Sequence, residues 1–140
     1  MDDVQTKDAQ AREMVKLTGV TPDVMVSDAN KASEFYQRAF GAREVMRHAT
    51  EDGKKLMHCH LVINNGSLFI YDPMPEYGHP LTAPQGYTLH LHVDDVDFWW
   101  GRALAAGCEV AMPLELQFWG DRYGQVTDPF GVRWSMGQSQ

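Results

Sequence analysis

The sequence predicts an α+β fold of two tandem βαβββ modules, each a curved, mixed four-stranded sheet with one helix on its outer face, enclosing a cavity. The first observation is an internal repeat, in which Val26-Ser27-Asp28 before one amphipathic stretch returns as Val93-Asp94-Asp95 before another. Helix-ending glycines, Gly41 and Gly107, follow each stretch at nearly the same distance. The second observation is that segments with the alternation of half-buried strands follow each helix.

The first module is expected over residues 19–72. Asp28 is placed to cap its helix, and Gly41 is placed to end it. The elements are expected as a strand at 19–27, a helix at 28–40, and strands at 44–49, 56–63 and 67–72. The third strand alternates an apolar face with a polar one, namely Met57, Cys59, Leu61 and Ile63 against His58 and His60.

A linker at residues 73–86, rich in proline, is expected to join the two modules. The second module is expected over residues 87–137, with a helix capped by Asp94 or Asp95. Its last hairpin turns at Asp128-Pro129-Phe130-Gly131, where Pro fixes one backbone angle and Gly closes the turn. Residues 1–18 form an N-terminal extension, either a short helix or a frayed tail.

Composition excludes several classes of function. The chain has 140 residues and a net charge of −7, and it has no cluster of basic residues, so nucleic acid is not an expected partner. No apolar stretch approaches the roughly 20 residues that span a bilayer, and no signal peptide is visible, so no membrane association is expected. Cys59 and Cys108 fit no metal or redox spacing and are interpreted as buried thiols. A cytoplasmic location is expected.

Three motifs give the chain a recognisable family resemblance. They are Phe35-Tyr36-Gln37-Arg38-Ala39-Phe40-Gly41-Ala42, His90-Leu91-His92-Val93-Asp94-Asp95-Val96, and Phe118 to Gly124 followed by Asp128-Pro129-Phe130-Gly131. Over about residues 20–137 the chain resembles the vicinal oxygen chelate superfamily of glyoxalases, bleomycin-resistance proteins and extradiol dioxygenases, and within it the PhnB-like branch. The resemblance implies a ligand cavity and a homodimer, with modules swapped or unswapped.

The resemblance also implies where a metal ion would be held. Metal-dependent members place His and Glu side chains on the first and last strands of each module. The matching positions in this sequence are Thr21, Thr88, Ser135 and one residue among Phe69, Ile70 and Tyr71. Hydroxyl groups and aromatic rings do not replace imidazole or carboxylate as ligands of a divalent ion. No metal ligand and no cofactor are therefore predicted at these positions, although a divalent metal at a displaced histidine cluster stays an alternative.

The predicted ligand-binding residues are those that the strand alternation or a glycine-flanked loop turns toward the cavity. They are His58, His60, His90, His92, Asp23, Phe69, Tyr71, Trp119, Asp121 and Tyr123. Each has a structural alternative: the histidines can be neutral wall residues, Asp23 can be solvated, Phe69 and Tyr71 can fill the cavity floor, and the loop can be pinned by an Asp–Arg pair.

Two functions remain open from the sequence. The first is a small-molecule binding protein of the bleomycin-resistance type, with a cavity between the sheets and without the usual metal site. The second is a metal-dependent lyase, isomerase or dioxygenase that uses the displaced histidines. Trp99 and Trp100 are expected in the core or in the interface of a homodimer.

Overall fold

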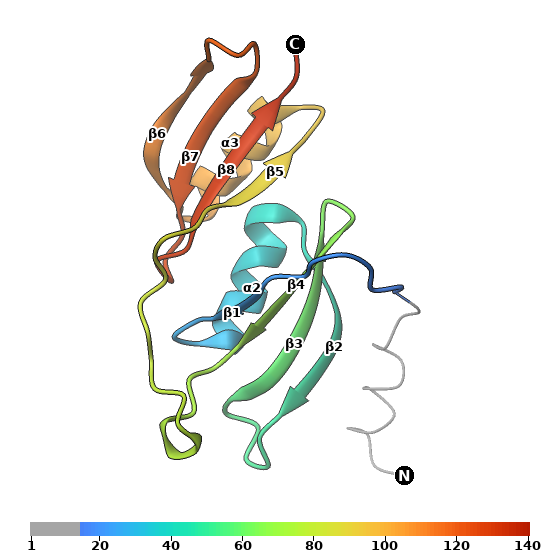
Figure 1. Cartoon of the computed structure of the whole chain (residues 1–140), viewed down its shortest axis with the longest axis vertical. Coiled ribbons are helices and arrows are strands. Elements are labelled where there is room, and N and C mark those ends of the chain that lie inside the picture. Colours follow the sequence, from blue (N-terminus) through green and yellow to red (C-terminus); the bar gives the residue numbers. More distant parts are fainter. Residues whose placement is uncertain (1–14) are drawn as a thin grey trace.

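A computed structural model describes residues 15–140 and contains two four-stranded sheets arranged end to end (Figure 1). Module one comprises β1 (Asp23–Met25), α2 (Ala29–Phe40), β2 (Arg43–Ala49), β3 (Leu56–Ile63) and β4 (Gly66–Tyr71). Module two comprises β5 (Leu89–His92), α3 (Val96–Ala106), β6 (Glu109–Leu116), β7 (Arg122–Thr127) and β8 (Arg133–Gln138). The helix or tail expected in the N-terminal extension lies mostly outside the described residues.

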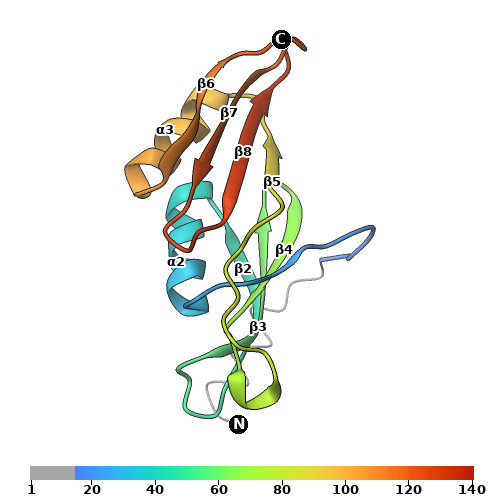
Figure 2. The same cartoon turned by 60° about the vertical axis from the view of Figure 1, so that its left-hand side comes forward.

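The strand order confirms the tandem βαβββ fold. It is β1-β4-β3-β2 in module one and β5-β8-β7-β6 in module two. In each sheet the first strand pairs in parallel with the last, and the other pairs are antiparallel. Both helices cover the same side of the sheets, which leaves the opposite side of both sheets uncovered by helices (Figure 2).

The helix ends follow the sequence signals. The side chain of Asp28 accepts a hydrogen bond from the Lys31 amide, and Gly41 ends α2 with φ 64°. In module two the cap is Asp95 rather than Asp94, because its carboxylate accepts from the Phe98 amide at 3.2 Å. Gly107 ends α3 with φ 125°.

The last strand of each sheet also caps the helix of its own module. Asp72, just after β4, accepts a hydrogen bond from the Ala29 amide at 2.9 Å. Gln138, at the end of β8, accepts one from the Val96 amide at 2.8 Å. A side-chain carboxylate in module one and a side-chain amide in module two thus accept a hydrogen bond from equivalent backbone N–H groups, which have no partner within the helix.

Two strands are shorter than the sequence predicts. The first strand begins at Asp23, and the first strand of module two begins at Leu89. Gly19 falls inside the predicted first strand and has φ 66°, a left-handed conformation that interrupts an extended strand.

Met57 is a second correction, because it is 58% exposed instead of facing the core. The ladder between β2 and β3 passes from the His48–His58 pair to the Ala49–Leu56 pair, so Met57 is left over as a bulge. The bulge turns Leu56 inward, where it is fully buried. Both cysteines are buried as expected, and burial raises the pKa of Cys59 and Cys108 to about 12.

The modules are joined through a buried carboxylate. Asp128 accepts hydrogen bonds from the Tyr36 hydroxyl at 2.6 Å and from the Trp134 indole nitrogen at 2.9 Å. Burial raises the pKa of Tyr36 well above its usual value, and the neighbouring carboxylate raises it further, so Tyr36 stays protonated as a donor. A second link runs between the helices, where Arg102 of α3 donates to the Ala39 carbonyl at 3.1 Å.

The linker runs along the outside of the molecule from β4 to β5 (Figure 1). It folds back on itself near β4, where Met74 and His79 form an isolated bridge around a short 3₁₀ turn, Pro75–Tyr77. Within residues 15–140, no helix combines the length and the apolar character needed to cross a bilayer.

Candidate functional site

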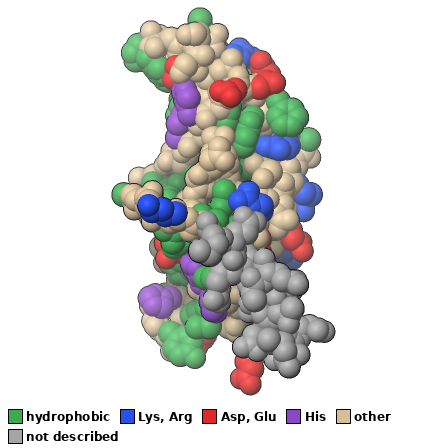
Figure 3. Space-filling view, turned by 90° about the vertical axis from the view of Figure 1, so that its right-hand side faces the viewer, with side chains coloured by type: hydrophobic (Ala, Val, Ile, Leu, Met, Phe, Trp, Pro, Cys, Tyr) green, Lys and Arg blue, Asp and Glu red, His purple; other side chains and the backbone are tan. Residues whose placement is uncertain are grey.

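The predicted binding residues lie mainly on the side of the sheets that the helices leave uncovered. On β5, His90 and His92 are exposed while Leu91 between them is buried in the core. Figure 3 shows that histidine side chains gather in two separate groups along this side, one toward each end of the molecule. The structure therefore divides the predicted histidine set between the modules.

In module two, four side chains form one hydrogen-bonded chain. Ser135 Oγ lies 2.7 Å from His90 Nδ1, and His90 Nε2 lies 3.2 Å from His92 Nδ1. His92 Nε2 lies 2.7 Å from Ser139 Oγ. The chain runs from the buried hydroxyl of Ser135 to the exposed hydroxyl of Ser139.

Aromatic side chains border this chain on one side. The Tyr123 ring stacks on His90 with centroids 5.8 Å apart, and the Trp119 ring meets Tyr123 edge to face at 5.3 Å. Trp119 is 48% exposed, so its ring is available to a ligand. Burial lowers the pKa of His90 and the nearby His92 lowers it further, while Asp121 acts in the opposite direction. Trp119, Asp121 and Tyr123 are thus placed around His90.

The register of β5 and β8 explains why the two imidazoles meet. His90 is paired with Ser135, and His92 is paired with Gly137. A Cβ atom at Gly137 would lie 3.0 Å from His90 Cε1 and 3.4 Å from His92 Nδ1. The absence of a side chain at Gly137 therefore gives both rings room above the strand.

Module one has a different arrangement. His60 Nε2 lies 2.9 Å from Ser67 Oγ, and the rings of His58 and His60 both meet Phe69 edge to face. Burial lowers the pKa of both histidines, and Asp23 partly opposes this for His58. In module one both imidazoles therefore pack against Phe69, whereas in module two the imidazoles of His90 and His92 lie against each other.

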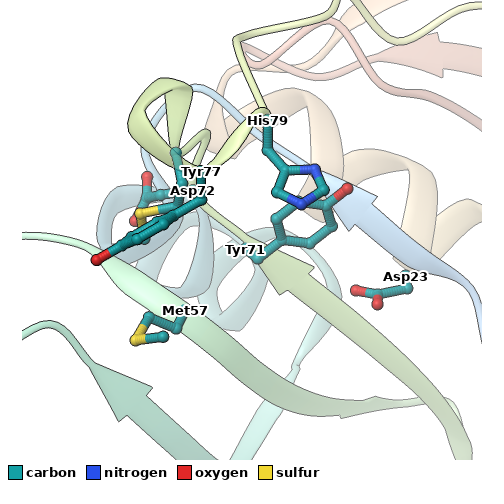
Figure 4. A pocket seen from close by; sticks show the side chains of 7 residues that line it. Asp23, Met57, Tyr71, Asp72, Tyr77 and His79 are labelled. Carbon is teal, nitrogen blue, oxygen red and sulfur yellow. The ribbon is translucent and has the colours of Figure 1, made fainter.

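A cavity of about 430 Å³ lies beside module one under the folded linker. Figure 4 shows that His79 extends from the linker toward Tyr71, with Asp23 on one side and Tyr77 and Met57 on the other. Asp23 and Tyr71 were predicted to bind a ligand. Met57, Tyr77 and His79 were not, because only the bulge in β3 and the fold of the linker bring them to the cavity.

A second cavity, of about 320 Å³, lies at the junction of the modules. Its lining includes Ser67, Thr88 and His90, together with Trp134. His90 is thus one predicted residue that lines a cavity shared by both modules. Ser67 was not predicted, and only the pairing of the strands could have revealed its position.

The loop before β7 is anchored in an unexpected way. The sequence left open that an Asp–Arg pair holds this loop in place, and the adjacent Asp121 and Arg122 were the available residues. Arg122 instead pairs with Asp97 of α3 at 2.7 Å. This pair ties the start of β7 to the neighbouring helix, so the aromatic residues of the loop are held by module two itself.

The superfamily positions for metal ligands hold residues that do not suit a metal ion. The ladders pair Asp23 with Phe69 and His90 with Ser135, so Phe69 is the module-one equivalent of Ser135. Thr21, Thr88, Ser135 and Phe69 thus occupy the four positions, and none offers imidazole, carboxylate or thiolate. The described part of the chain also holds no group of three or more His, Cys, Asp or Glu side chains that could bind a metal ion.

Comparison with known proteins decides the family. The model of the Glyoxalase/Bleomycin resistance protein/Dioxygenase superfamily matches residues 17–136. The chain belongs to this superfamily. An uncharacterized protein of Mycobacterium bovis is 44% identical over 125 residues, which are 85% of this chain and 82% of that protein.

Two solved structures share the fold. Protein PA1353 from Pseudomonas aeruginosa has a TM-score of 0.71 and 26% identity, covering 89% of this chain and 99% of that chain. The PhnB protein from Bacillus cereus has a TM-score of 0.70 and 19% identity, covering 87% of this chain and 100% of that chain. The superfamily member described here therefore shares the two-module fold of these structures.

Proposed function

We propose that this superfamily member is a small-molecule binding protein of the bleomycin-resistance type, within the PhnB-like branch. The observation that supports this most is the cavity of about 430 Å³ between the linker and the polar side of module one. Its volume lies in the range of ligand pockets, and its walls combine aromatic rings with a few polar groups. No residue at the usual metal positions is needed for this function.

The chemistry of the cavity favours a ligand with an aromatic part and a positive charge. Tyr71 and Tyr77 present rings on which a planar group can stack, and a cation is attracted to the face of such rings. Asp23 supplies a carboxylate at the same cavity. Met57 adds a flexible apolar contact, which suits ligands of varied shape.

A homodimer is part of this proposal. The edge of module two carries large apolar side chains that are exposed in one chain, namely Val110 at 50%, Met112 at 38% and Leu116 at 66%. They lie on β6, an edge strand of the sheet. A second copy placed against this edge would bury them. Light scattering should give about twice the chain mass of 15.8 kDa.

A thermal-shift screen tests the binding function. Planar aromatic amines should raise the melting temperature, and a ligand present at 100 times its Kd should stabilise the protein by about 2.7 kcal/mol. Tyr71→Ala and Tyr77→Ala should each remove the shift. Leu81→Ala is a matched control, since Leu81 is a linker residue that is 58% exposed and does not line this cavity. A screen of cationic, carbonyl and apolar aromatic compounds without any shift would reject the proposal.

A further inference from the structure

We propose that His90 and His92 together form a two-imidazole site for one divalent first-row transition metal ion. The site would use His90 Nε2 and His92 Nδ1, which face each other at 3.2 Å. It is distinct from the superfamily positions Thr21, Thr88, Ser135 and Phe69. The proposal does not depend on the small-molecule function and can hold whether or not that function is correct.

Each ring has an outer nitrogen bonded to a serine, His90 Nδ1 or His92 Nε2, and an inner nitrogen that faces the other ring. The serine partners decide whether the inner nitrogens can be free of protons. His90 Nδ1 lies 2.7 Å from the hydroxyl of Ser135, and His92 Nε2 lies 2.7 Å from the hydroxyl of Ser139. When both hydroxyls accept an N–H from the ring, the two inner nitrogens carry only lone pairs. Without a metal ion, one inner nitrogen instead keeps the proton and donates to the other at 3.2 Å, and metal binding would move that proton to the outer nitrogen of the same ring. Metal-binding histidines in proteins use their second nitrogen in this same way, to fix the tautomer and the ring orientation.

The distance between the inner nitrogens fits a shared metal ion. With each nitrogen about 2.1 Å from the metal, a separation of 3.2 Å corresponds to an N–metal–N angle of about 100°. This value lies between the angles of square-planar and tetrahedral coordination. A small rotation of either ring would direct both lone pairs toward the metal.

The surroundings hold the two rings in place and leave the metal accessible. Gly137 lies under both rings, and Tyr123 stacks on His90. His90 and His92 are both exposed, so a metal ion can enter and can keep further positions for water or for a donor atom of a ligand. With two protein ligands the affinity should follow the Irving–Williams order, with Cu(II) bound more tightly than Zn(II).

Module one provides a matched pair that should not bind in this way. His58 and His60 have the same spacing along a strand, but Phe69 lies against both rings. His60 Nε2 is taken by Ser67 at 2.9 Å. The spacing His-x-His is thus present in both modules. Among the described residues, only the pair in module two, His90 and His92, has ring nitrogens that are hydrogen-bonded to each other.

The first experiment is a titration of the full-length, untagged protein with Cu(II) and with Zn(II), in the presence of glycine as a competing weak chelator. His90→Ala and His92→Ala should each weaken binding by about tenfold or more, because one imidazole cannot chelate. The double variant His58→Ala/His60→Ala should bind as the unmodified protein does. Equal losses in the two sets of variants, or no binding above the glycine background, would overturn the proposal.

The second experiment identifies the ligating atoms directly. Long-range proton–nitrogen NMR spectra of the imidazole rings, recorded with and without Zn(II), should show shifts at His90 Nε2 and His92 Nδ1. The signals of His58 and His60 should stay in place. Ser135→Ala should weaken binding by about tenfold and change the tautomer of His90, because the hydroxyl orients the ring. If His92→Ala fails to fold, His92→Gln removes the imidazole and keeps a polar side chain, and unchanged metal binding in that variant would contradict the site.

Discussion

The two modules share one frame and differ in the side chains that cover its polar side. On β4, Phe69 and Tyr71 stand where β8 has Ser135 and Gly137. Phe69 of β4 lies against both His58 and His60, while the small residues of β8 leave room for His90 and His92 to meet. The repeat places Asp23 and Met25 of β1 where β5 has His90 and His92, so the two modules present different side chains at equivalent positions beside β4 and β8.

The modules also differ at the turn that precedes their last strand. Module two uses Asp128, which reaches across to Tyr36 of module one. Module one turns instead through Asn64 and Asn65, both with positive φ, and Asn64 donates to the His92 carbonyl at 2.8 Å. The buried link between the modules therefore depends on a turn that only the second module has.

The largest expected effect comes from breaking that link with Asp128→Ala. The substitution removes the acceptor of the Tyr36 hydroxyl, of the Trp134 indole and of the Val132 amide, all of them buried. Leaving these donors without partners should lower the free energy of unfolding by about 3–5 kcal/mol. Urea denaturation followed by tryptophan fluorescence measures this loss. Asp94→Ala is the control, because Asp94 is an exposed acid beside the real helix cap, and an equal effect in both variants would contradict the role of Asp128.

A second prediction concerns the substitution Ser135→Phe, which gives β8 the residue that β4 has at the equivalent position, Phe69. Ser135→Phe should place a ring where Phe69 lies in the first sheet, and so push His90 away from His92. Because Ser135 is only 2% exposed, the larger side chain should cost about 1–3 kcal/mol in stability. The NMR signature of the histidine pair and any metal binding should be lost. A variant that keeps both would show that the residue size on β8 does not control the pair.

A smaller change tests the same point without a new ring. Gly137→Ala adds a Cβ atom 3.0 Å from His90 Cε1 and 3.4 Å from His92 Nδ1, at a position where φ is not positive. It should separate the imidazoles at a cost of about 1 kcal/mol or less. Gly66→Ala in module one is the matched control, since its nearest neighbour would lie at 3.5 Å. Histidine NMR should show a change in the first variant and none in the second.

The fold was largely readable from the sequence, because the repeat, the helix caps and the helix-ending glycines are local signals. Asp28, Gly41 and Gly107 act as predicted, and the third strand has the predicted bounds. Met57 was misassigned because a bulge depends on the partner strand, which a single strand does not reveal.

The candidate site was readable only in part. Strand alternation identified the histidines that face the polar side, but their pairing depends on the register between strands far apart in the sequence. Ser135 and Gly137 acquire their importance only once β8 is placed beside β5. The cavity under the linker likewise depends on the bridge between Met74 and His79, and no periodicity in this proline-rich segment signals that contact.

The smallest expected effect is a pH dependence to which His58 and His60 of module one contribute, together with His90 of module two. Burial lowers the pKa of His58 and His60 in the folded protein, while unfolded histidine titrates near 6.5. The unfolded chain therefore binds more protons below about pH 6.5, so the stability from these neutral imidazoles is complete above that pH and decreases as the pH falls. Urea denaturation at a series of pH values from neutral to mildly acidic should show this decline. His58→Gln/His60→Gln should make the decline shallower and leave the part due to His90. An unchanged slope in that double variant would mean that other groups cause the decline.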